Sequence, residues 1–221
     1  MSMKSELKEF VARRLFEIDA VRFSESGWRL AVHEQHPRAP LSPFYIDLRL
    51  LRSYPRFLCD VVSLMVSTTP QLWDELELIS DVPVSSTPIV TLVSQRTGIA
   101  MVSPRLAVKT HGASGEILGA WRPGQSVAIV DDLRTTGGTK ERVMELYETN
   151  GLKVVAVAAL IDRGSPEGAP VAGRPFLATY GWSWLLRFYQ RAKLVPSDAI
   201  EHAERYPDFL TQHLAGCQGC A

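Results

Sequence analysis

The chain has 221 residues, 46% of them hydrophobic, which favours a large folded domain and argues against intrinsic disorder. Its 24 lysines and arginines balance 24 aspartates and glutamates, so a general nucleic-acid binder, which normally carries a basic excess, is disfavoured. Apolar runs fall short of the about 20 residues of a membrane span, and three cysteines do not make a disulfide framework, so we expect a cytoplasmic protein with neither nucleic acid nor membrane as partner.

The first predicted elements alternate between helix and strand. Residues 4–18 place apolar side chains on one face, as an amphipathic helix does. Residues 31–43 carry three prolines and are expected to form a loop. Residues 44–51 alternate apolar and polar side chains like a strand, and a helix is predicted from Pro55 to about residue 67, since proline is tolerated in a first turn.

The middle of the chain alternates apolar runs of strand length with helical patterns. The strand-length runs are 76–82, 100–102, 126–130 and 154–161, and the helical patterns are 87–97 and 138–150. Strands that alternate with helices indicate an α/β fold with a mostly parallel twisted sheet flanked by helices. Loop follows to about residue 174, and residues 181–213 hold further helical segments.

Residues 127–139, VAIVDDLRTTGGT, carry the most specific chemical signal. Asp131 and Asp132 stand at the carboxyl end of a predicted parallel strand, where ligands collect in open sheets. Thr135–Thr139 then begin a helix whose exposed amides and hydroxyls suit a phosphate, while carboxylates can accept hydrogen bonds from sugar hydroxyls. The pattern indicates a sugar phosphate site. The alternative is a purely structural turn, with the aspartates capping the helix and the glycines easing the bend.

This motif resembles the 5-phosphoribosyl pyrophosphate (PRPP) motif of type I phosphoribosyltransferases. Two further stretches make the chain most similar to orotate phosphoribosyltransferases. SPFYIDLR, at residues 42–49, is similar to that family's SPxYxDxR segment, and RLAVKTHG, at 105–112, resembles its RKxxKxHG loop. The resemblance spans roughly residues 40–165.

The resemblance implies one phosphoribosyltransferase domain over residues 1–221. Within it we expect an N-terminal helix and hood over about 1–50, an α/β core over about 51–180, and a C-terminal helical cover and tail over about 181–221. A flexible active-site loop is expected over about 104–120, where it can exclude water.

The implied activity is transfer of ribose 5-phosphate from PRPP to orotate, with release of pyrophosphate, in pyrimidine nucleotide biosynthesis. The implied catalytic residues are Lys109, His111, Asp131, Asp132 and Arg105. The 5′-phosphate is assigned to Thr135, Thr136, Gly137, Gly138 and Thr139, the base to Arg163, Phe44 and Tyr45, and the pyrophosphate loop to Pro83, Val84, Ser85 and Ser86. Arg163 is expected to pair with the carboxylate of orotate, and Arg49 to form an ion pair with Asp47.

The resemblance also implies a magnesium ion held mainly by PRPP and water, and a homodimer whose flexible loops are shared between subunits. The chain departs from the family pattern at three positions, because Asp81 and Ser86 replace glycines and Leu106 replaces a lysine. The family segment before SPxY is replaced by Trp28-Arg29-Leu30 and a proline-containing insert. Two alternatives therefore stay open: a phosphoribosyltransferase for another base, or a weakly catalytic PRPP- or nucleotide-binding regulator.

The remaining reactive and aromatic side chains are assigned to structural roles. The histidines His33, His36, His202 and His213 are expected at the surface or in loops, the side chains of Trp182, Trp184 and Phe188 in the core, and Cys217 and Cys220 in a solvated tail.

Overall fold

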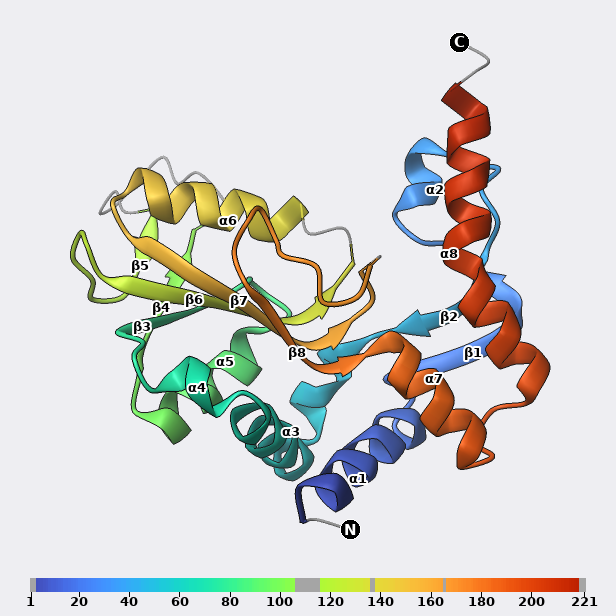
Figure 1. The fold of residues 1–221 in the computed structure, drawn as a ribbon, viewed down its shortest axis with the longest axis horizontal. Coiled ribbons are helices and arrows are strands. Elements are labelled where there is room, and N and C mark those ends of the chain that lie inside the picture. The colour runs from blue at the N-terminus through green and yellow to red at the C-terminus, as the bar shows by residue number, and fades with distance from the viewer. Residues whose placement is uncertain (1–2, 106–115, 136–137, 165, 219–221) are drawn as a thin grey trace. The chain divides into compact units, whose positions relative to one another are not determined.

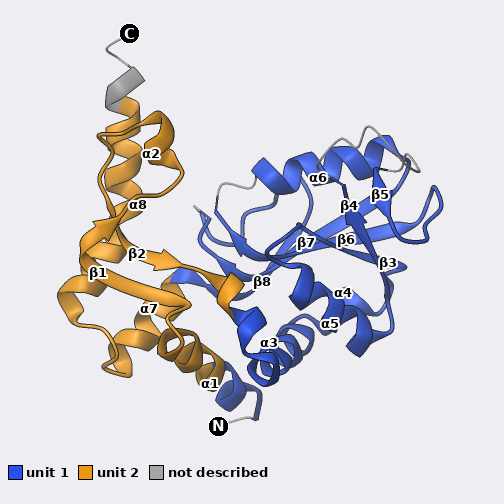
Figure 2. Ribbon diagram, turned by 180° about the vertical axis from the view of Figure 1, so that it is seen from behind, with its two compact units in different colours: residues 1–8, 51–182 blue, residues 9–50, 183–221 orange. Residues whose placement is uncertain are grey.

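The computed structural model describes residues 3–105, 116–135, 138–164 and 166–218, with side chains described as far as residue 215. The chain forms two compact units (Figure 2). The first unit comprises residues 1–8 and 51–182, and the second comprises residues 9–50 and 183–221. The single-domain organisation stays a prediction.

A six-stranded sheet forms the centre of the first unit (Figure 1). Its strands are β3 (Leu78–Asp81), β4 (Ala100–Pro104), β5 (Ile117–Leu118), β6 (Ser126–Arg134), β7 (Lys153–Asp162) and β8 (Phe176–Gly181). The strand order is β5-β4-β3-β6-β7-β8, and every neighbouring pair is parallel except β4 with β5. The predicted mostly parallel α/β sheet is therefore confirmed.

Helices cover both faces of this sheet (Figure 1). Helix α6 (Gly138–Thr149) lies on one face, and α3 (Pro55–Thr68), α4 (Pro70–Trp73) and α5 (Thr87–Thr97) lie on the other. Residues 127–130 of β6 are fully buried, because a parallel strand between two helical layers has no solvent face. Their burial fixes the strand ends that carry the polar residues.

Three strands differ from the sequence expectation. Strand β6 extends beyond residue 130 to Arg134, because its ladder with β7 continues through Asp131, which pairs with Ala159. Strands β5 and β8 were not predicted. Strand β5 has two residues, and β8 is an edge strand whose first residues are only half-buried, so neither carries a continuous apolar run.

The second unit is built around an antiparallel pair of strands, and α1 runs into it from the first unit. Its elements are α1 (Met3–Glu17), β1 (Val21–Trp28), α2 (Val32–Gln35), β2 (Ser42–Ile46), the 3-10 helix η1 (Leu48–Ser53), α7 (Trp182–Arg191) and α8 (Ser197–Gln218). Aromatic rings join them: Phe44 packs edge-on against Tyr206 with 5.8 Å between ring centroids. The Tyr189 hydroxyl donates to the Ala12 carbonyl at 3.2 Å.

The second unit differs from the sequence expectation in three ways, and local side-chain contacts explain two of them. The strand expected over residues 44–51 ends at Ile46, because the Asp47 carboxylate accepts the Arg49 backbone N–H at 3.3 Å and starts a turn. Strand β1 was not predicted from the sequence. The assignment of His33 to the surface or a loop was wrong: it lies in α2 and is 3% exposed, and its Nδ1 accepts the Leu30 backbone N–H at 2.8 Å.

Among the described residues, no helix combines the length and apolar character that crossing a membrane requires.

Candidate active site

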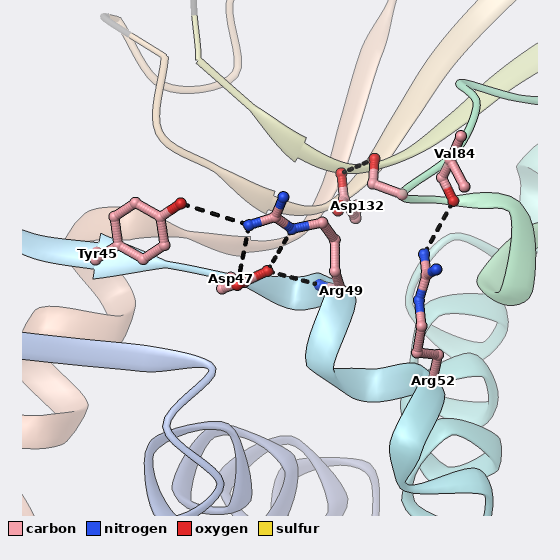
Figure 3. Close-up of polar contacts among 7 residues, drawn as sticks. Tyr45, Asp47, Arg49, Arg52, Val84 and Asp132 are labelled. Atoms are coloured by element: carbon pink, nitrogen blue, oxygen red, sulfur yellow. Dashed lines mark hydrogen bonds and ion pairs between the residues drawn. The ribbon is translucent and has the colours of Figure 1, made fainter. Parts of the chain in front are cut away.

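The candidate site lies at the carboxyl ends of the parallel strands, where the strand order reverses. From β3 the chain builds β4 on one side of the sheet, and then β6, β7 and β8 on the other. Open α/β sheets bind ligands at such a reversal. Ser85, in the loop after β3, donates its hydroxyl to Asp132 Oδ1 near the end of β6 at 3.3 Å (Figure 3). The reversal point is thus lined by a hydroxyl and a carboxylate.

Asp131 and Asp132 form a buried carboxylate pair. They are 4% and 8% exposed, and the Asp132 backbone N–H donates to Asp131 Oδ1 at 2.8 Å. Burial and then the neighbouring charge of Asp131 raise the pKa of Asp132 to about 7. Asp132 therefore exchanges its proton in the neutral pH range, whereas an ordinary aspartate is fully ionised there.

Lys140 is a buried cation beside this pair, and the sequence analysis did not single it out. Its Nζ lies 2.5 Å from Asp131 Oδ2, donates to the Leu133 carbonyl at 2.8 Å, and belongs to a side chain that is 5% exposed. The sequence feature that could have identified it is its spacing from Val143 and Tyr147, which places all three on one face of α6. Val143 and Tyr147 are fully buried. A lysine on such a face requires a buried partner, and Asp131 is that partner.

The start of α6 follows the carboxylates directly. Thr135, Gly138 and Thr139 are exposed there, and Thr136 and Gly137 lie outside the described residues. A Cβ placed on Gly138 would meet no heavy atom of its surroundings within 4 Å. The Cβ position of Gly138, the first residue of α6, is therefore unobstructed, and the N-terminus of such a helix suits an oxyanion.

The loop of Pro83, Val84, Ser85 and Ser86 is closed by its last residue. Ser86 is fully buried, and its hydroxyl accepts the Val82 N–H at 2.8 Å and donates to the Val82 carbonyl at 3.0 Å. Val84 is 70% exposed, and its carbonyl accepts a hydrogen bond from Arg52 at 3.1 Å (Figure 3). The Pro83–Val84 peptide is cis. The serine at the family's glycine position thus serves to close the turn.

Asp81 ends β3 and is 1% exposed. Its Oδ2 accepts a hydrogen bond from the hydroxyl of Thr87, the first residue of α5. A carboxylate at a helix N-terminus is favoured by the helix dipole. Asp81 is therefore joined to the start of α5 through Oδ2, while its buried Oδ1 has no hydrogen-bond partner among the described residues.

Two arginines follow strand ends at the same edge of the sheet. Arg105 follows β4, and its backbone N–H donates to the Glu116 carbonyl at 2.7 Å. Arg163 follows β7, and its backbone N–H donates to the Arg134 carbonyl at 2.9 Å. The expected loop residues Lys109 and His111, and the departure Leu106, lie outside the described residues.

Known proteins share both the sequence pattern and this fold. A model of the phosphoribosyl transferase domain matches residues 81–184. An orotate phosphoribosyltransferase of Enterococcus faecalis is 30% identical over 161 residues, which are 72% of this chain and 73% of that protein. The chain belongs to the orotate phosphoribosyltransferase family.

Larger relatives contain a similar region. Uridine 5'-monophosphate synthase of Bos taurus is 27% identical over 167 residues, which are 75% of this chain and 35% of that protein. The structure of a UMP synthase from Leishmania donovani matches with a TM-score of 0.76 at 27% identity, over 92% of this chain and 42% of that chain. This chain thus spans about a third of the bovine protein and less than half of the Leishmania chain.

Within this family pattern, the SPFYIDLR segment occupies β2 and the turn after it in the second unit. Phe44 is 1% exposed, so its side chain belongs to the core of that unit, while Tyr45 is half-buried. The expected ion pair is present: Arg49 Nε lies 2.7 Å from Asp47 Oδ1, and Arg49 also donates to the Tyr45 hydroxyl at 3.5 Å (Figure 3). A contact of Phe44 or Tyr45 with a base stays a prediction.

Arg134 and Asp162 are the other charged residues that the sequence analysis missed at this edge. They end the neighbouring strands β6 and β7 and face each other in register. The sequence feature that could have identified them is that oppositely charged residues lie at the carboxyl ends of two consecutive apolar strands.

Proposed function

We propose that this chain transfers ribose 5-phosphate from PRPP to orotate, giving orotidine 5'-monophosphate and pyrophosphate. The observation that carries the proposal is the buried Asp131–Asp132 pair at the strand-order reversal, followed directly by the open N-terminus of α6. Membership of the orotate phosphoribosyltransferase family supports orotate as the base.

In this proposal each part of the site binds one part of the two substrates. Asp131 and Asp132 accept hydrogen bonds from the ribose hydroxyls, and Asp132 accepts them most strongly when it is ionised. Thr135, Thr136, Gly137, Gly138 and Thr139 form the 5′-phosphate cradle. The loop of Pro83, Val84, Ser85 and Ser86 and the side chains of Arg105, Lys109 and His111 face the pyrophosphate. Arg163 pairs with the orotate carboxylate, and its fork of donors suits a planar carboxylate.

Stabilisation of the departing charge supplies most of the catalysis in this scheme. The bond from ribose to pyrophosphate breaks as the orotate nitrogen approaches, so negative charge grows on the leaving group. Fixed cations aimed at that charge lower the barrier. Arg105 and Lys109 supply the positive charge, and His111 donates hydrogen bonds.

A magnesium ion fits the oxygen-rich donors at this edge of the sheet. Among the described residues, no group of three or more His, Cys, Asp or Glu side chains is arranged to hold a metal. Mg²⁺ commonly keeps water and substrate phosphate oxygens as ligands, with few protein carboxylates. When bound with PRPP, the ion would supply further neutralisation of the pyrophosphate charge. Of the described residues, Ser85 and Asp132 would offer a hydroxyl and a carboxylate to the water ligands of such an ion.

The test is turnover of orotate. Purified protein with PRPP, Mg²⁺ and orotate is expected to consume the ultraviolet absorbance of orotate, and Asp132→Asn is expected to weaken PRPP use. Because Asp81 and Ser86 replace glycines of the family pattern, the same assay should also separate two alternatives: a transferase for another base and a weakly catalytic PRPP- or nucleotide-binding regulator. Pyrophosphate release with a purine and none with orotate would assign another base. A thermal shift with PRPP and no turnover with any base would indicate a binding protein.

A further inference from the structure

Arg134 and Asp162 form a buried ion pair across the ends of two strands. Arg134 Nε lies 2.8 Å from Asp162 Oδ1, and the two side chains are 6% and 2% exposed. Isolated buried charges are costly to desolvate, so such a pair requires that its remaining donors and acceptors find partners as well. Both residues meet that requirement.

The partners are backbone groups of the segment that follows β7. Arg134 donates to the Pro166 carbonyl at 2.8 Å and to the Ala169 carbonyl. Asp162 accepts the Gly164 N–H at 2.8 Å and the Gly168 N–H at 2.6 Å. The guanidinium also lies over the Phe176 ring, 4.4 Å from its centroid.

Arg163 lies inside this network. The Arg163 backbone N–H donates to the Arg134 carbonyl. The preceding residue, Asp162, supplies the carboxylate of the ion pair, and this carboxylate accepts the backbone N–H of the following residue, Gly164. The backbone on both sides of Arg163 is thus fixed to a rigid strand pair. A side chain that must meet a planar carboxylate gains from such positioning, because a misplacement of about 1 Å can cost about 100-fold in activity.

We propose that Arg134 and Asp162 are a positioning pair that aims Arg163 at the carboxylate of the base. This inference rests on the proposed function, since it needs a base that carries a carboxylate. Neither residue of the pair contacts substrate in this proposal. The pair contributes to specificity for orotate over a base that lacks the carboxylate.

Gly164 lies against the guanidinium of Arg134 and leaves room for it. A Cβ on Gly164 would lie 1.9 Å from one guanidinium nitrogen of Arg134 and 2.4 Å from its central carbon. An alanine at this position therefore displaces the guanidinium and disturbs the pair without removing its charge. In a chain that lacks the Arg134 side chain, the three nearest atoms that this Cβ would meet are gone.

The test compares Arg134→Ala, Arg134→Lys and Asp162→Asn with the wild-type chain. Removing either partner is expected to raise the KM for orotate about 10- to 100-fold, while the KM for PRPP changes far less. Uracil, which lacks the carboxylate, serves as a competitive probe, and its inhibition constant is expected to stay unchanged. Arg134→Lys keeps the charge and is expected to recover part of the loss.

A matched control comes from an exposed pair in the same part of the chain. Arg174 lies 2.7 Å from Glu148, but the side chains are 45% and 41% exposed. Arg174→Ala is expected to leave both KM values unchanged, since exposed ion pairs contribute little.

Gly164→Ala retains both members of the pair and so covers the case in which a variant at Arg134 or Asp162 fails to fold, and a double-mutant cycle adds a further test where Arg134→Ala folds. Gly164→Ala alone is expected to raise the orotate KM as Arg134→Ala does, and to have little further effect in the Arg134→Ala chain. Additive effects would overturn the proposal, and so would an unchanged orotate KM in folded variants of an active wild-type chain. If the wild-type chain itself does not turn over orotate, the proposed function fails, and the positioning role fails with it.

Discussion

At the scale of single residues, the charge of Asp132 determines how the site responds to pH. Its pKa of about 7 results first from burial and then from Asp131. Because the ionised carboxylate accepts a ribose hydroxyl more strongly than the protonated acid does, kcat/KM for PRPP is expected to rise with pH between about pH 6 and pH 8. Asp132→Asn is expected to remove this rise. A flat wild-type profile in that range would contradict the assignment.

The same raised pKa has the opposite effect on stability. The native state keeps its proton at Asp132 up to about pH 7, whereas an unfolded aspartate loses it near pH 4. Protonation therefore stabilises the fold at low pH, and this contribution is lost as the pH rises through about 7. Asp132→Asn has no carboxyl to titrate, so its free energy of unfolding should not show this decrease. In denaturant titrations, it is expected to rise relative to the wild-type value between about pH 4 and pH 8. An equal pH dependence in both chains would contradict this.

Lys140 tunes that ionisation. Its positive charge lowers the pKa of Asp132, against the larger effects of burial and of Asp131. Lys140→Met is therefore expected to move the rise of kcat/KM for PRPP to higher pH, because the carboxylate pair loses its cation. The control is Lys153→Met, which removes an exposed lysine from the start of β7. A profile that keeps its midpoint in Lys140→Met would exclude this role.

At the scale of the elements, Ser86 couples the loop after β3 to α5. Its buried hydroxyl accepts from and donates to the backbone of Val82. Ser86→Ala leaves the Val82 amide without its partner in a buried turn, and is expected to lower the free energy of unfolding by about 1–3 kcal/mol. Ser63→Ala, which removes an exposed hydroxyl from α3, is the control. Equal stability of the two variants in urea titrations would show that the turn does not depend on Ser86.

The sequence predicted elements well where one pattern dominated. β6 and β7 were found because both faces of each strand are buried, which produces continuous apolar runs. β8 has no such run, because its first three residues are only half-buried at the sheet edge. The sequence pattern ends β6 too early for a different reason: a polar Asp131 after an apolar run predicts the end of a strand, but this residue pairs with Ala159 inside the ladder.

At the scale of the whole molecule, the sequence predicted which residues bear chemistry and left their partners undetermined. Asp131 and Asp132 could be assigned because motif and strand end coincide. Their contacts with Lys140 and Ser85 come from a helix face and from a loop 47 residues away, and these depend on strand order. The pairing of Arg134 with Asp162 likewise needs the β6–β7 register, which local patterns do not encode.

The homodimer with a shared loop, which the family resemblance implies, gives a quantitative mixing prediction. Lys109→Ala and Asp131→Asn are each expected to abolish most activity. If Lys109 reaches the partner subunit's site, a mixed dimer of the two variants has one intact site and one doubly defective site. Random exchange makes half of the dimers mixed, so the mixture should recover roughly one quarter of the wild-type activity. If Lys109 serves its own subunit, every site keeps one defect and mixing restores nothing. Mixing Asp131→Asn with the Lys109→Ala/Asp131→Asn double variant is the control, because no combination of those chains assembles an intact site.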